Sequence, residues 1–175
     1  MLALEKQTGQ FQNFNLRPEK HGDENVPGAD LKIRITASND ILSEFHPSLK
    51  ASLYRAPHPG EMDMVDQAEA EEGQPPALTR LAFGNKLHGF KWDDEIVGAA
   101  FTVHYGTGGK SDIELDDCTV DSFTIEPLDG GSCSVSFRVK CNPDEKAVGK
   151  LSRLMGNEIE FTLRPPEAPE MREAA

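Results

Sequence analysis

The sequence lacks a long apolar stretch, a cysteine pair at metal-ligand spacing and an excess of positive charge. No run of about 18 apolar residues is present to span a bilayer, and Glu5 interrupts the start too early for a signal peptide. The three cysteines are Cys118, Cys133 and Cys141, and no two of them have C-x-x-C spacing. This indicates reduced structural thiols rather than a zinc or thioredoxin-type site. We therefore expect a cytoplasmic protein with no membrane partner, no metal and no cofactor.

Positive charge is scarce, because 18 Lys and Arg residues stand against 30 Asp and Glu residues, a net charge of −12. Such a surface repels phosphate backbones, so general coating of nucleic acid is disfavoured unless positive charge is locally concentrated. Aromatic residues make up only 7% of the 175 residues, while 15 Gly and 12 Pro indicate a turn-rich globular protein. A chain of this length is normally one domain.

Changes in composition divide the chain. Residues 1–30 are polar with little periodicity, which predicts an irregular N-terminal arm. Residues 31–164 are expected to form a single β-rich domain, and the tail over 165–175, after Pro165 and Pro166, is expected to fray. Within the domain, residues 56–77 combine four prolines with six acids and no Lys or Arg between Glu61 and Glu72, which predicts an acidic mobile loop.

Apolar residues at every second position predict strands over 31–35, 97–105 and 159–163, with further strands over 111–115 and 118–126. The clearest stripe runs from Cys133 to Cys141, with Ser134, Ser136, Arg138 and Lys140 expected to point outward. Short helices are predicted over 40–45 and 48–54, and a longer one starts with Asn142 as its cap. The fold class is mainly β (α+β), an antiparallel sandwich or open barrel with one C-terminal helix before the last strand and short N-terminal helices.

Two groups of acids are candidates for a protein-binding surface. The first lies in the acidic loop: Glu61, Asp63, Asp66, Glu69, Glu71 and Glu72. The second alternates along a predicted strand, where no glycine follows at the place that a calcium loop requires, so a solvated edge is expected: Asp112, Glu114 and Asp116.

One group of basic residues runs against the overall charge. It joins the outward face of the 133–141 strand to the polar face of the following helix: Arg138, Lys140, Lys146, Lys150 and Arg153. The group is either the ordinary solvated face of an amphipathic helix or a local contact for phosphate, single-stranded nucleic acid or an acidic segment.

No motif names a reaction. The stretch from Gly106 to Ser111 ends in Gly-Lys-Ser, but His104 stands where a phosphate-binding loop needs its first glycine, and a strand is expected to follow rather than a helix. His88 and His104 could approach one another only if two strands pair in a suitable register, so ordinary strand histidines are the favoured interpretation. There is no G-x-S-x-G elbow, and we expect no catalytic residues and no enzyme.

Four short stretches carry a resemblance: Trp92-Asp-Asp-Glu, Tyr105-Gly-Thr-Gly-Gly-Lys-Ser, Asp117-Cys-Thr-Val-Asp and Asn142-Pro-Asp-Glu-Lys-Ala. Over roughly residues 30–166 the chain resembles uncharacterised proteins of phages and prophages. The resemblance implies an accessory protein made inside a bacterial host and brings no catalytic residues with it.

Three functional hypotheses follow. The first is a non-enzymatic accessory protein that engages a host or phage protein through its acidic surface, as an inhibitor or a DNA mimic. The second is a replication or recombination accessory that binds single-stranded DNA through the basic group. The third is a component of the virion.

Overall fold

The computed structural model describes residues 1–168 of the chain, and the end of the predicted tail, 169–175, lies outside the described residues. The protein is mainly β, with a few short helices, as the sequence predicts. Residues 165–168 follow the last strand without regular structure.

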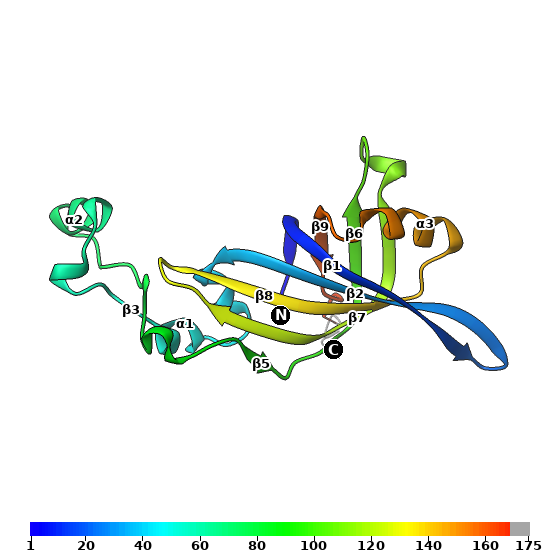
Figure 1. Ribbon diagram of the computed structural model, residues 1–175, viewed down its shortest axis with the longest axis horizontal. Helices are drawn as coiled ribbons and strands as arrows, with labels where there is room; N and C mark the ends of the chain where they lie inside the picture. The colour runs from blue at the N-terminus through cyan, green and yellow to red at the C-terminus, as the bar shows by residue number, and fades with distance from the viewer. Residues whose placement is uncertain (169–175) are drawn as a thin grey trace, which may run out of the picture. The chain divides into compact units, whose positions relative to one another are not determined.

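Nine strands are present in the described part of the chain (Figure 1). Their bounds are β1 Leu4–His21, β2 Glu24–Ser38, β3 Tyr54–Arg55, β4 Arg80–Leu81, β5 Phe90–Trp92, β6 Ile96–His104, β7 Ile113–Pro127, β8 Ser132–Cys141 and β9 Glu158–Arg164. The α-helices are α1 Leu49–Leu53, α2 Met64–Glu71 and α3 Glu145–Leu154, and the 3-10 helices are Asn39–Glu44, Pro59–Glu61, Gly84–Lys86 and Gly109–Ser111.

Seven of the strands form one antiparallel sheet in the order β5-β7-β6-β9-β1-β2-β8. An additional pairing between β7 and β8 closes six of them into a barrel, with β5 as an extra strand beside β7, while β3 and β4 form a separate two-stranded sheet. The sequence predicts an antiparallel sandwich or open barrel, and the structure has the barrel, closed by the β7–β8 pairing. The short N-terminal helices and the helix before the last strand are also confirmed.

The chain divides into two compact units. The first contains residues 1–33, 94–121 and the chain from 137 onward, and the second contains residues 34–93 and 122–136. Strands β2, β7 and β8 contribute to both units, so the expected single domain over 31–164 stays a prediction.

The first unit has an aromatic core. Phe161 of β9 stacks on Phe101 of the neighbouring β6 with ring centroids 5.1 Å apart, and Phe137 of β8 meets Phe161 edge to face at 6.0 Å. All three side chains are at most 1% exposed. Full burial of such rings makes the largest contribution of any side chain to the hydrophobic stabilisation of a core.

The second unit packs around Tyr54 and Phe123. Phe45 lies edge to face against Phe123 at 5.4 Å and against Trp92 at 6.4 Å. The buried hydroxyl of Tyr54 donates to backbone carbonyls at Leu128 and Ser132 and accepts the amide N–H of Leu128 at 3.0 Å. Burial raises the pKa of Tyr54 to about 12.

Residues 1–30 form strands β1 and the start of β2, so the predicted irregular arm is wrong. Only Gly9 and Phe11 are buried along β1, which explains why the sequence shows no alternating apolar pattern there. The hairpin turns at Gly22, whose φ of 66° suits glycine. The two strands are hydrogen-bonded neighbours in the sheet, and along their polar part Arg17 also pairs with Asp30 at 3.1 Å.

The predicted strand stripe over 133–141 is confirmed by the burial of all five apolar members. Ser134 is the exception on the other face, because it is 2% exposed instead of pointing into solvent, and its hydroxyl accepts a hydrogen bond from Arg34 at 2.8 Å. The two strands expected over 111–115 and 118–126 are one strand, β7, which contains Asp117 and Ser122 at φ 53° and 57°.

Candidate functional site

The acidic segment over 56–77 contains a helix, α2, where the sequence predicted only a loop. Asp63 is the reason that the helix starts where it does. Its side chain accepts hydrogen bonds from the amides of Val65 and Asp66, and the Asp66 side chain accepts from the amide of Asp63. This capping box satisfies donors that a helix start otherwise leaves unpaired and lowers the pKa of Asp63.

Two arginines hold the segment in place. Arg55 lies 3.1 Å from the carboxylate of Glu61, and its hydrogen bond lowers the Glu61 pKa. Arg80 donates to the Glu61 carbonyl at 2.7 Å and lies 3.7 Å from Asp66. Three of the six candidate acids, Glu61, Asp63 and Asp66, are thus engaged within the protein, and their charge is partly balanced.

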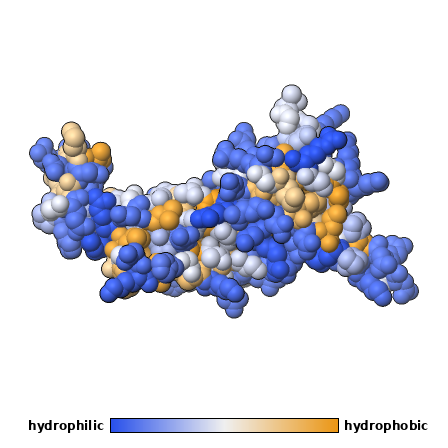
Figure 2. Space-filling view, viewed as in Figure 1, coloured by the Kyte–Doolittle hydropathy of each residue, from blue (hydrophilic) through white to orange (hydrophobic). Residues whose placement is uncertain are grey.

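The other three acids have no basic partner in the described part of the chain: Glu69, Glu71 and Glu72. They share α2 and its C-terminal end with two apolar side chains that face solvent, Met64 at 86% exposure and Val65 at 64%. No residue of α2 is buried. Figure 2 shows hydrophobic colour over this helix inside a mainly hydrophilic region. The segment therefore presents carboxylates and apolar groups together.

A hollow of about 210 Å³ lies beside α2 within the same unit. Its polar positions are Asp66, Glu69 and Gln74. Prolines and small or apolar side chains form the rest of its wall: Pro57, Pro59, Met62, Ala70, Pro76 and Ala77. The prolines fix the backbone around the hollow and remove amide donors from it. An apolar side chain of a partner fits such a wall better than a charged one.

The second acidic group belongs to the first unit and is a separate candidate. Glu114 and Asp116 on β7 are exposed, as expected for a solvated edge. Asp112 is engaged instead: one oxygen accepts the Tyr105 amide at 3.0 Å and the other lies 3.1 Å from Nδ1 of His104. These hydrogen bonds lower the Asp112 pKa.

His104 lies in a polar chain that sequence reasoning missed. Its Nε2 lies 2.8 Å from the hydroxyl of Thr162, which also accepts the amide of Lys6 at 3.1 Å. An Asp-His-hydroxyl order is also the order of a nucleophilic triad, but the Thr162 hydroxyl belongs to a residue only 5% exposed and accepts a hydrogen bond from the Lys6 amide. The chain therefore joins β6, β9, β1 and the segment before β7. The sequence feature that could have revealed this polar chain is the position of Asp112, eight residues after His104 and across a glycine-rich turn.

His88, the partner considered for His104, belongs to the second unit. Across residues 1–168, no group of three or more His, Cys, Asp or Glu side chains is placed to hold a metal ion. The glycine-rich stretch forms a turn and the 3-10 helix Gly109–Ser111, after which β7 begins at Ile113. The prediction of a turn followed by a strand is confirmed.

The five basic candidates are not equivalent. Arg138 donates to both carboxylate oxygens of Asp121 at 2.8 and 2.9 Å, and Lys140 lies 2.7 Å from the same carboxylate. Burial would raise the pKa of Asp121, but these partners outweigh it and lower the pKa to about 2. The positive charges of Arg138 and Lys140 are therefore paired with the Asp121 carboxylate.

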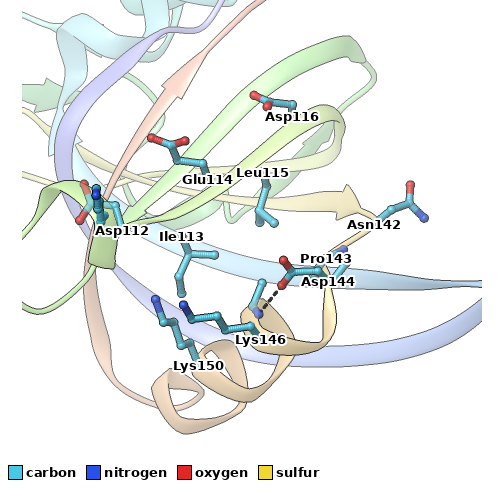
Figure 3. Close-up of a pocket in the computed structure, with 12 residues that line it drawn as sticks. Asp112, Ile113, Glu114, Leu115, Asp116, Asn142, Pro143, Asp144, Lys146 and Lys150 are labelled. Atoms are coloured by element: carbon cyan, nitrogen blue, oxygen red, sulfur yellow. Dashed lines mark hydrogen bonds between the residues drawn. The ribbon is translucent and has the colours of Figure 1, made fainter.

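Lys146 and Lys150 belong to a different place, a hollow of about 370 Å³ between the start of β7 and helix α3 (Figure 3). The helix begins at Glu145 with Asp144 as its cap, two residues later than the expected Asn142, because the Asp144 side chain accepts the amide of Ala147 at 2.7 Å. Arg153, in the last turn of α3, is exposed. The basic group thus separates into a neutralised pair, a pair at the hollow and one exposed arginine.

The three cysteines are free and buried. Burial raises the pKa of Cys133 to about 11, and a hydrogen bond with Cys118 together with burial raises that of Cys141. A thiol with a raised pKa is a poor nucleophile. No helix within residues 1–168 has the length and apolar character needed to cross a membrane.

The comparisons with known proteins add no relative to this description. No protein-family model, no curated protein and no solved structure matches the chain.

Proposed function

We propose that the protein is a non-enzymatic accessory protein, of the kind made by phages and prophages inside a bacterial host, that binds another protein through the acidic helix α2. The observation that carries the proposal is that α2 buries none of its residues while it exposes Met64 and Val65 beside carboxylates. Exposed apolar groups within a polar surround are typical of protein interaction sites.

The charge of α2 defines the chemistry of the partner. Glu69, Glu71 and Glu72 add three negative charges on and just after one short helix, and no Lys or Arg occurs between Glu61 and Glu72. A complementary surface is basic with an apolar centre, a combination found where proteins bind the phosphates and bases of DNA. A protein that occupies such a surface competes with DNA for it and so acts as an inhibitor or DNA mimic.

The fixed start of α2 supports the same proposal. The capping box at Asp63 and the contacts of Arg55 and Arg80 hold the segment before any partner arrives. Preorganisation lowers the conformational entropy that a binding segment loses on association.

The test is affinity capture from a bacterial host with the tagged full chain, read by mass spectrometry after nuclease treatment. The variant E69Q/E71Q/E72Q removes three charges from the α2 region, and the matched control D93N/D94N/E95Q removes three exposed charges elsewhere. A partner captured by the wild type and the control but lost with the α2 variant supports the proposal. Capture that depends on nucleic acid, or that survives equally in the α2 variant, contradicts it.

A further inference from the structure

The hollow beside α2 has the size of one side chain. Its volume is about 210 Å³, whereas pockets for small molecules usually start at about 300 Å³. A cavity of about 150 Å³ lined by apolar side chains admits a benzene ring. The hollow therefore has room for a single aromatic side chain but not for a larger ligand.

Rigid rings form much of the wall. Pro57 and Pro59 precede α2 and Pro76 follows it, and all three line the hollow together with Ala70 of the helix. Aromatic rings pack well against prolines, as they do where proline-rich segments dock in aromatic-lined grooves. Here the prolines belong to this chain, so the ring has to come from the partner.

One face of α2 completes the wall. Asp66, Glu69 and Ala70 are three or four residues apart and so share this face. Met64 and Val65 are not among the residues that line the hollow. The hollow is therefore a contact separate from the two exposed apolar side chains of the same helix.

Contacts within the chain hold the hollow in shape. Arg80 of β4 donates to the Glu61 carbonyl at 2.7 Å and lies 3.7 Å from Asp66. The side-chain amide of Gln67 donates to the Met62 carbonyl at 3.3 Å. These contacts fix the start of α2 in the absence of a partner, so less conformational entropy is lost when the hollow is filled.

Glu69 determines the charge that the occupant must carry. Asp66 already lies beside Arg80, whereas the half-buried Glu69 has no ion pair or side-chain hydrogen bond with another described residue. No Lys or Arg is among the residues that line the hollow. An apolar ring alone would take the Glu69 carboxylate out of water without a partner, which costs free energy. A basic side chain next to the ring removes that cost.

From these features we infer that the hollow receives one aromatic side chain of the partner protein, flanked in the partner's sequence by Lys or Arg residues that lie beside Glu69. The inference rests on the proposed function, because it names the part of the partner that α2 contacts. A buried aromatic anchor is typical of the residues that carry most of the binding free energy of an interface.

The test is an NMR titration of the isotope-labelled full chain with two capped peptides, Lys-Trp-Lys and Lys-Ala-Lys, of which the second lacks the ring. A70L fills the hollow and leaves every charge in place, and its matched control is A68L, which enlarges an exposed alanine of α2 outside the hollow. E69Q removes the carboxylate at the hollow, and its matched control is E71Q on the same helix. Leucine and glutamine are good helix formers, and the amide spectrum shows whether each variant is folded.

We expect Lys-Trp-Lys to shift the amide resonances of Ala70 and Ala77 with a dissociation constant of about 1–5 mM. Removing the ring, as in Lys-Ala-Lys, or filling the hollow with A70L should weaken binding at least about tenfold. E69Q should weaken it roughly threefold, because it removes one ion pair at the surface. A68L and E71Q should leave the affinity unchanged.

The inference is overturned if Lys-Trp-Lys shifts no resonance of the hollow below about 10 mM. It is also overturned if Lys-Ala-Lys binds as tightly as Lys-Trp-Lys, if A70L binds as tightly as A68L, or if E69Q has no more effect than E71Q. These results contradict this inference alone, because capture by the wild-type chain tests the proposed function separately. Failed capture together with specific binding of Lys-Trp-Lys contradicts the proposed function and supports the preference of the hollow for a ring between basic residues.

Discussion

At the scale of single residues, Asp121 is a charged group that stabilises the folded protein. Its side chain is 16% exposed and receives both Arg138 and Lys140. A carboxylate whose pKa is about 2 in the folded protein, against roughly 3.9 in an unfolded chain, stabilises the fold at neutral pH. Arg138 and Lys140, two of the five basic residues considered for nucleic acid, therefore pair with a carboxylate within the fold.

The first prediction concerns this group. The free energy of unfolding of D121N should be about 2 kcal/mol below that of the wild type at pH 7. Because the folded pKa is depressed, the wild-type advantage is complete above roughly pH 4 and is lost as the pH falls toward 2. Urea unfolding at a series of pH values measures this, and a difference between the two proteins that does not change down to pH 2 would contradict it.

A second prediction at this scale concerns Tyr54. Y54F removes the hydroxyl that bonds the part-buried backbone at Leu128 and Ser132, while the direct hydrogen bond from the Leu128 amide to the Ser132 carbonyl at 3.0 Å stays. The expected loss of stability is therefore about 1 kcal/mol. Thermal unfolding followed by circular dichroism gives the value, and a variant as stable as the wild type would show that water replaces the hydroxyl.

At the scale of elements, α2 and α3 differ in how they use their apolar residues. Leu151 of α3 is fully buried, whereas α2 buries nothing and exposes Met64 and Val65. A helix of eight residues without tertiary packing gains little from its own hydrogen bonds, so the capping box and the arginine contacts maintain α2. The exposure of Met64 and Val65 is the observation on which the proposed contact with a partner protein rests.

The third prediction follows from that difference. M64S/V65S should leave the melting temperature within about 1 °C of the wild type, because neither side chain is buried. L151A should cost about 2–5 kcal/mol, because it opens a cavity under α3. Differential scanning calorimetry of both variants tests the pair of expectations. A large loss of stability in M64S/V65S would mean that these side chains pack inside the protein.

A comparison of the predicted and observed strands and helices shows how much of the fold could be predicted from the sequence. Alternation identified the strands with one buried face, such as β8, and the capping pattern near Asn142 found α3 within a few residues. Alternation did not identify β1, because Phe11 is nearly alone in the core there and most side chains face solvent. Helix α2 was missed because acids and prolines dominate its composition, although Asp63 and Asp66 were already three residues apart.

The sequence identified the charged residues of the candidate sites, but it did not show which of them lie together in the fold. The sequence places Arg138 and Lys140 in one basic group with Lys146 and Lys150, but only the fold brings Asp121 to the first pair. The hollow likewise depends on residues from the glycine-rich turn, β7 and α3 that meet through tertiary structure.

At the scale of the whole molecule, the net charge of −12 remains the dominant electrostatic fact. Like charges on a compact chain repel one another, and salt screens that repulsion. The fourth prediction is that raising NaCl from about 10 to about 150 mM, which shortens the Debye length from about 30 to about 8 Å, raises the melting temperature by a few degrees. A melting temperature that falls with salt would mean that ion pairs outweigh the repulsion.

The most direct test of the central claim, that α2 binds a basic protein partner, is the dissociation constant of the captured partner measured at low and at physiological salt. The account predicts binding that weakens steeply with salt, and for E69Q/E71Q/E72Q at low salt an affinity at least about tenfold below that of D93N/D94N/E95Q. Equal affinities for these two variants, or binding by the wild type that does not change with salt, would contradict the account.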